Sequence, residues 1–162
     1  MSIVLTRVDN RLIHGQVLES WVPTFNANCI VVANDKIANS AMQKLLMEAS
    51  VPKGIRVYIG TVEDAAEILA TEGLADARVI LLFATSSDAL SAHRKGVRYD
   101  KLNLGNMHAG AGKFKCSCTI ALDADDVENL NSLESSGVKI VSQCVPSDKE
   151  VGWQKMLRIT KM

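Results

Sequence analysis

The 162-residue sequence predicts an α/β protein with an open, mainly parallel, doubly wound sheet and helices on both faces. Strand-like and helix-like segments alternate along the whole chain, which is the pattern of a parallel sheet built from crossover units. Two strand-like segments, 29–33 and 79–83, are apolar without interruption, as expected for strands covered on both faces. No linker, repeat or low-complexity segment divides the chain, so we expect a single domain over residues 1–162.

Spacing and helix caps predict the individual elements. Residues 14–25 carry apolar residues at helical spacing and reach a proline near their end. Thr61 and Asp64 have the spacing of a capping box, and Gly137 is placed to stop a helix. The helix expected at 34–49 carries Ile37, Met42, Leu45 and Leu46 on one side. The strands are expected at 3–5, 29–33, 55–59, 79–83, 101–104, 118–122 and 138–141, and the helices at 14–25, 34–49, 61–70, 85–95, 123–135 and 149–159.

Composition argues against several classes of protein. Lys plus Arg and Asp plus Glu both number 18, whereas a nucleic-acid module more often has a basic excess. No apolar run approaches the ~20 residues that span a bilayer, and the N-terminus lacks a signal core. We therefore expect a cytoplasmic protein with no nucleic-acid partner and no direct membrane insertion. The four cysteines are expected as free thiols, and the Cys116-Ser-Cys118 spacing does not suit zinc, so no metal is expected.

Candidate functional residues follow the strands, because ligands of open parallel sheets lie beyond the carboxyl ends of the strands. The first such segment carries Arg7, Asp9, Arg11 and His14 within eight residues. His14 stands where a helix begins, and the positive end of a helix favours an anion there. Arg7 and Arg11 can each bind phosphate oxygens through a planar fork of donors. Asp9 can hold one ring nitrogen of His14 and leave the other free to attack.

These residues suit a histidine that is itself phosphorylated. Imidazole is a good nucleophile near neutral pH, and cationic groups stabilise the charge on a phosphoryl group in transfer. Gly15 lets a bulky group approach the backbone, and it joins Gln16 as a candidate phosphate-binding residue. No nucleotide-binding glycine loop is present, so no ATP, NAD or other cofactor is expected. The alternative is a structural histidine beside ordinary salt bridges.

The segment Arg7-Val8-Asp9-Asn10-Arg11-Leu12-Ile13-His14-Gly15-Gln16-Val17 closely resembles the active-site segment of one protein family. This family is the IIB component of the mannose/fructose/sorbose type of bacterial phosphoenolpyruvate:sugar phosphotransferase system. The resemblance continues at 31–35, at 79–83 and at 102–107 with Gly112-Lys113, and so covers nearly the whole chain.

The resemblance implies a phosphocarrier subunit. It would accept a phosphoryl group from a IIA protein onto His14, through the ring nitrogen nearer the main chain. It would then deliver the group to the 6-hydroxyl of a sugar that enters through membrane IIC and IID partners. The residues matching Arg11 and Asp9 belong to the family's active loop. No IIA sequence is fused here, so the donor is expected to be a separate chain.

A second group of candidates lies after other strands. Thr85 and Ser86 are candidate phosphate contacts, and candidates for contacts to a partner or substrate are Asp35, Gly105, Asn106, His108 and Lys113, most of them in a glycine-rich loop at 105–112. Helix capping explains Asp35, Thr85 and Ser86 nearly as well, and simple exposure is the alternative for His108. Asn106 stands where the family often has glycine. Trp21 and Trp153 are expected to pack in the core or an interface.

Two other functions stay open at this point. One is a regulatory phosphoprotein that uses the same His14 chemistry without a dedicated sugar permease. The other is a non-enzymatic α/β module that binds a nucleotide or phosphate through the same loop. Neither the sugar nor the oligomeric state can be read from the sequence.

Overall fold

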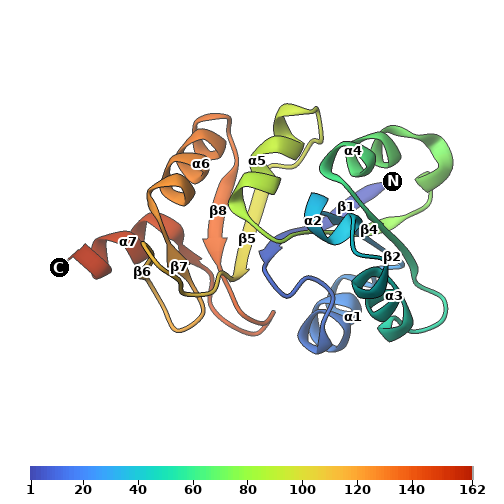
Figure 1. The fold of residues 1–162 in the computed structure, drawn as a ribbon, viewed down its shortest axis with the longest axis horizontal. Coiled ribbons are helices and arrows are strands. Elements are labelled where there is room, and N and C mark those ends of the chain that lie inside the picture. The colour runs from blue at the N-terminus through green and yellow to red at the C-terminus, as the bar shows by residue number, and fades with distance from the viewer. Residues whose placement is uncertain (162) are drawn as a thin grey trace.

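A computed structural model describes residues 1–161 and confirms the predicted fold class (Figure 1); Met162, the last residue of the expected domain, lies outside them. The main sheet has seven strands in the order β3-β2-β4-β1-β5-β8-β9. All neighbours are parallel except β9, which runs antiparallel to β8. The strands are β1 (Ser2–Asp9), β2 (Cys29–Ala33), β3 (Arg56–Gly60), β4 (Arg78–Phe83), β5 (Lys101–Asn106), β8 (Lys139–Ser142) and β9 (Val151–Gly152).

Helices cover both faces of this sheet. One core cluster joins the sheet to α4 (Val62–Ala70), α5 (Ser86–Arg94), α6 (Ala124–Ser135) and α7 (Trp153–Lys161). The other joins it to the π-helical segment η1 (Val17–Trp21) and to α1 (Val22–Phe25), with flanking contacts from α2 (Asp35–Ala38) and α3 (Ala41–Ser50). A 3-10 turn η2 (Glu72–Leu74) follows α4, and a small antiparallel pair, β6 (Phe114–Lys115) and β7 (Ala121–Leu122), stands apart from the main sheet.

The sequence patterns locate most of these elements correctly. Every residue of β2 is buried, and so is every residue of β4 after Arg78, as their uninterrupted apolar character predicts. Thr61 and Asp64 form the expected capping box at the start of α4. Gly137 adopts a φ of 95° after α6, a conformation that glycine reaches without steric cost. Trp21 and Trp153 are both buried.

Four element predictions were wrong. The strand expected at 3–5 extends to Asp9, because Arg7 and Asp9 find buried polar partners inside the sheet. The helix expected at 34–49 is two helices, since Ser40 caps α3 separately. The strand expected at 118–122 shrinks to β7, and the last helix begins at Trp153 after the unforeseen β9. The apolar side expected on the 34–49 helix lies largely in solvent, with Met42, Leu45 and Leu46 all exposed.

Candidate functional site

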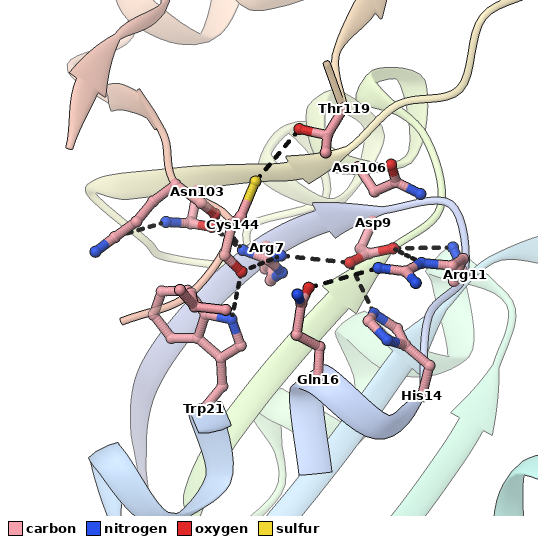
Figure 2. Close-up of polar contacts among 12 residues, drawn as sticks. Arg7, Asp9, Arg11, His14, Gln16, Trp21, Asn103, Asn106, Thr119 and Cys144 are labelled. Carbon is pink, nitrogen blue, oxygen red and sulfur yellow. Dashed lines mark hydrogen bonds and ion pairs between the residues drawn. The ribbon is translucent and has the colours of Figure 1, made fainter. Parts of the chain in front are cut away.

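The predicted site lies at the carboxyl end of the central strand β1, where the chain turns into the helical segment that leads to α1 (Figure 2). The Leu12 amide closes the turn by donating to the Asp9 carbonyl at 2.9 Å. Leu12 is buried with a φ of 57°, a left-handed conformation that is uncommon for a residue with a side chain. The turn therefore holds some strain, as functional loops often do.

The neighbouring strand β5 fixes this turn through Asn106. The Asn106 carbonyl accepts from the Asn10 amide at 2.9 Å, and the Asn106 side-chain amide donates to Asn10 Oδ1 at 2.7 Å. Asn106 and Gly105 were predicted in a glycine-rich loop, but both belong to β5. The carboxamide of Asn106 thus supports the turn between Asp9 and Arg11, a contact that glycine could not make.

His14 begins the helical segment. Its carbonyl accepts from the Leu18 amide at 3.1 Å, and its side chain is 14% exposed. The ring atom Nε2 lies 2.9 Å from Asp9 Oδ2. A carboxylate only accepts hydrogen bonds, so Nε2 carries the hydrogen and Nδ1 keeps a free lone pair in the neutral ring. Within residues 1–161, Nδ1 has no hydrogen-bond partner. The pairing of His14 with Asp9, and the free ring nitrogen, are as the sequence predicts.

Asp9 is fully buried, and its carboxylate contacts the other charged residues of the site. Oδ1 accepts from the Arg11 amide at 3.0 Å, and Oδ2 is 3.4 Å from Arg7 Nη2 as well as bonded to His14. Burial by itself raises the pKa of Asp9. The hydrogen bonds from His14 and Arg11, with the nearby positive charge, outweigh burial and hold its pKa below the ordinary value. The carboxylate is therefore ionised and able to orient the imidazole.

Arg11 differs from Arg7 in its freedom to move. Its side chain is 50% exposed, with Nε 3.7 Å from Asp9 Oδ1 and Nη2 3.5 Å from Gln16 Oε1. Both contacts are long, so the guanidinium can turn toward an anion at little cost. Beside it, Gly15 faces open space, because a Cβ there would meet no atom within 4 Å. Arg11, Gly15 and Gln16 thus lie together beside His14.

The loop position predicted for Arg7 was wrong. Arg7 lies within β1 and is fully buried beneath the site, with its guanidinium 5.0 Å from the Trp21 ring. Nη2 donates to the Cys144 carbonyl at 3.1 Å as well as to Asp9. Burial lowers the pKa of Arg7, and the Asp9 charge opposes that shift. Because the guanidinium is fully buried and both terminal nitrogens are bound inside the protein, Arg7 can act on an incoming phosphate only through Asp9.

The structure does not bring Thr85, Ser86 or Asp35 into the site. The Thr85 hydroxyl accepts from the Asp88 amide and caps α5. Ser86 is buried and donates to Asp126 Oδ1 at 2.7 Å. Asp35 accepts from the Val62 amide at 3.0 Å, which ties α2 to the start of α4. Helix capping, the alternative stated for these three residues, accounts for Thr85, whereas Asp35 and Ser86 bond to residues of other helices.

Within residues 1–161, neither of the other two loop candidates forms a hydrogen bond or ion pair with His14. Lys113 Nζ is 3.3 Å from Asp126 Oδ2, so its charge is directed to α6. His108 is exposed in the connection after β5. Sequence reasoning missed two residues close to the site. The Thr119 hydroxyl lies 3.5 Å from the Cys144 sulfur, and the Cys144 carbonyl also accepts from Trp21 Nε1 at 3.2 Å. Neither residue has a charge or motif in the sequence that would mark it.

Comparison with known proteins matches this arrangement to one family. The family model described as "PTS system sorbose subfamily IIB component" matches residues 3–162. The chain belongs to this family. It is therefore the subunit of a sugar phosphotransferase system that accepts a phosphoryl group and transfers it to a sugar. Within residues 1–161, each helix is too short or too polar to cross a membrane.

Individual relatives cover nearly the whole chain. It is 38% identical to the N-acetylgalactosamine-specific phosphotransferase enzyme IIB component 2 of Escherichia coli, over 96% of this chain and 99% of that protein. The crystal structure of the IIBSor domain of the sorbose permease from Klebsiella pneumoniae has a TM-score of 0.93 and 32% identity, covering 99% of this chain and 98% of that one. A mannose-specific EIIAB component of Escherichia coli is 29% identical over 93% of this chain and 47% of its own length.

Proposed function

We propose that Nδ1 of His14 carries the phosphoryl group. The observation that supports this assignment is the 2.9 Å contact between Nε2 of His14 and Asp9, which leaves Nδ1 as the ring atom with an unused lone pair. His14 is partly exposed, so a donor protein can reach it, whereas Asp9 beneath it is fully buried. An ionised carboxylate at Nε2 also stabilises the positive charge that the ring gains when Nδ1 forms its bond to phosphorus.

In the first half-reaction, the donor is a phosphohistidine of a IIA protein. The His14 Nδ1 lone pair attacks phosphorus, the phosphorus–nitrogen bond of the donor breaks, and its electron pair stays on the donor imidazole. Arg11 is free to turn and bind the phosphoryl oxygens, and the first amides of the helical segment after His14, which have no partner within that segment, can donate to the same oxygens. Positioning and charge stabilisation are sufficient for this chemistry, as in phosphoryl transfer generally.

In the second half-reaction, a sugar hydroxyl attacks the phosphorus of phospho-His14. The bond to Nδ1 breaks and its electron pair returns to the ring, where Nδ1 takes up the proton of the sugar hydroxyl and then releases it to water. Asp9 then holds the ring in the same orientation for the next cycle, because its contacts to Arg7 and to the Arg11 amide do not depend on Nδ1.

Phosphorylation of purified protein by phosphoenolpyruvate and the upstream carriers tests the assignment. We expect one acid-labile phosphate per chain, on Nδ1 of His14, identified by NMR correlation of phosphorus with the ring nitrogens. His14→Ala should carry none. His93→Ala, which removes a histidine in the last turn of α5 that packs against Tyr99, is the matched control and should label normally. Unchanged labelling of His14→Ala would reject the assignment.

We also infer the partners from the family. The relative named EIIAB matches this chain over about half its own length, which agrees with a IIA protein acting as donor. The acceptor sugar would be presented by membrane IIC and IID proteins, with this chain working at their cytoplasmic side. The names of its relatives suggest the first sugars to test, N-acetylgalactosamine and sorbose.

Sugar transfer in membranes that contain the cognate permease separates transport from regulation. Loss of label from phospho-His14 when one sugar is added, with appearance of that sugar phosphate, supports the transport role. A phosphoprotein that keeps its label with every sugar while it binds another protein would instead indicate a regulatory role.

A further inference from the structure

The guanidinium of Arg7 is held from below by two elements remote in sequence. Nη1 donates to the side-chain oxygen of Asn103 on β5 and, at 2.8 Å, to the carbonyl of Gln143. Nη2 donates to the carbonyl of Cys144. These three acceptors are neutral, so Asp9 is the one carboxylate that Arg7 contacts within residues 1–161. The positive charge of Arg7 is therefore directed to Asp9.

Gly105 provides the space for this arrangement. A Cβ at position 105 would lie 2.0 Å from both Cζ and Nη2 of Arg7, far inside van der Waals contact. The Trp21 ring packs over the same guanidinium. Gly105, predicted as a loop residue for a substrate or partner, thus lies against the Arg7 guanidinium; Figure 2 shows Arg7 between Asn103, Trp21 and Asp9. Nε of Arg7 is buried without a hydrogen-bond partner in the described chain, so the two terminal nitrogens fix the orientation of the fork.

A connected row of contacts runs from this pocket to the nucleophile. The Gln143 and Cys144 carbonyls and Asn103 orient Arg7, Arg7 contacts Asp9, and Asp9 bonds to His14 Nε2. Every group in the row is fully or partly buried, and His14 is the one that reaches the surface. Hydrogen bonds to neighbouring residues hold the groups beneath His14 in place. A carboxylate with a single acceptor contact to the ring would be free to rotate, whereas Arg7 and the Arg11 amide restrain both oxygens of Asp9.

We propose that Arg7 is a positioning residue for phosphoryl transfer, and that Asn103 and Gly105 hold it in place so that Asp9 keeps His14 in the Nε2–H tautomer. This inference rests on the proposed role of His14. Arg7 touches neither donor nor acceptor. It acts by fixing the carboxylate that selects which ring nitrogen is free.

Gly105→Ala is the direct test, because it keeps the charge of Arg7 and displaces its guanidinium. We expect kcat for transfer from phospho-IIA to fall roughly 10- to 100-fold, as small misplacements of reacting groups do, with KM for the donor unchanged because the exposed surface is untouched. The ¹⁵N shifts of the His14 ring should move from a dominant Nε2–H tautomer toward a mixture. Gly60→Ala, at the end of β3 and crowded against Asp64 at 2.9 Å, is the matched control that should leave kcat and tautomer unchanged.

Asn103→Ala, which removes one acceptor from Arg7, serves as a second variant if Gly105→Ala does not fold, with the same expected direction. A wild-type kcat and wild-type ring shifts in a folded variant overturn the inference, and so does a fall in kcat with the tautomer unaltered. Labelling of His14→Ala would refute the proposed function instead, while the ring shifts would still report whether Arg7 fixes the tautomer.

Discussion

Two carboxylates at the same edge of the sheet show opposite behaviour. Asp9 ends β1, and Asp88 lies in the first turn of α5, after the adjacent strand β4. Asp88 accepts from the Asn34 side chain at 2.8 Å and from the Ala84 amide at 3.2 Å, both neutral donors. Burial consequently raises the pKa of Asp88, whereas at Asp9 the hydrogen bonds from His14 and the Arg11 amide, with the charge of Arg7, outweigh burial and lower the pKa.

The comparison shows how a functional site, at Asp9, differs from a carboxylate with only structural contacts, at Asp88. Both carboxylates are hydrogen-bonded and placed where ligands of such sheets bind, Asp9 fully buried and Asp88 partly buried. The hydrogen-bonding groups of Asp88 are taken up by neighbouring residues of the protein. The hydroxyl of nearby Ser86 is likewise bonded to Asp126. The Asp9 region leaves two groups with capacity to spare, the exposed guanidinium of Arg11 and the free nitrogen of His14. Unused bonding capacity at the surface distinguishes the functional end.

The largest expected effect comes from removing the negative charge of Asp9. Asp9→Asn keeps the size of the side chain but removes the charge, and its amide can pair with His14 in the wrong tautomer. We expect the rate of phosphoryl transfer to fall by at least about 100-fold, following the effect of such replacements beside catalytic histidines. Single-turnover labelling from phospho-IIA measures this rate. A loss of less than tenfold would remove Asp9 from the mechanism.

Arg11→Ala should have the next largest effect on rate and almost none on folding. The exposed side chain makes long contacts, so thermal stability should stay unchanged. Loss of one cationic group at the phosphoryl oxygens should slow transfer by roughly 10- to 100-fold. Comparison of Tm and transfer rate in the same preparation checks both parts. A fall in Tm with a normal rate would show that Arg11 is structural.

Ser86→Ala should have the opposite pattern to Arg11→Ala, with lower stability and an unchanged transfer rate. It leaves Asp126 Oδ1 and the Asn129 side-chain amide each without the serine hydroxyl. Unpaired buried polar groups cost about 1–3 kcal/mol, so the free energy of unfolding in urea should fall by that amount. The transfer rate at 25 °C should match the unmutated protein. If a stably folded Ser86→Ala protein transferred the phosphoryl group more slowly, Ser86 would have a role in the functional site.

The acid dependence of stability should differ in sign between the two carboxylates. Asp9, with a lowered folded pKa, contributes stability above its unfolded value of about 3.9 and loses it as pH falls through the folded value. Asp88, with a raised folded pKa, loses stability as pH rises from about 3.9 through its folded value. Urea midpoints from pH 2.5 to 6 for Asp9→Asn and Asp88→Asn measure this. Parallel pH profiles for the two variants would contradict the assignment of partners.

Local sequence patterns predicted the sheet and the nucleophile. They failed for residues such as Arg7, whose placement depends on partners far away in the sequence. The run of buried strand residues and the Asp9–His14 pair are short-range features, visible within one segment. The partners of Arg7 are 96 and 137 residues away, at Asn103 and Cys144. Without them a buried arginine is improbable, so the strand was expected to end before it. The pairing of Ser86 and Lys113 with Asp126 on α6 could not be predicted for the same reason, since Asp126 is remote from both in sequence.

The central position of β1 bears on the biogenesis of the protein. The ribosome makes β1 before its two flanking strands, which begin only at Arg78 and Lys101, and the carbonyl groups beneath Arg7 come later still, at Gln143 and Cys144. A nascent chain thus emerges with His14 exposed but unsupported. Competence for phosphoryl transfer should appear only after most of the polypeptide has left the exit tunnel, as a late event in maturation.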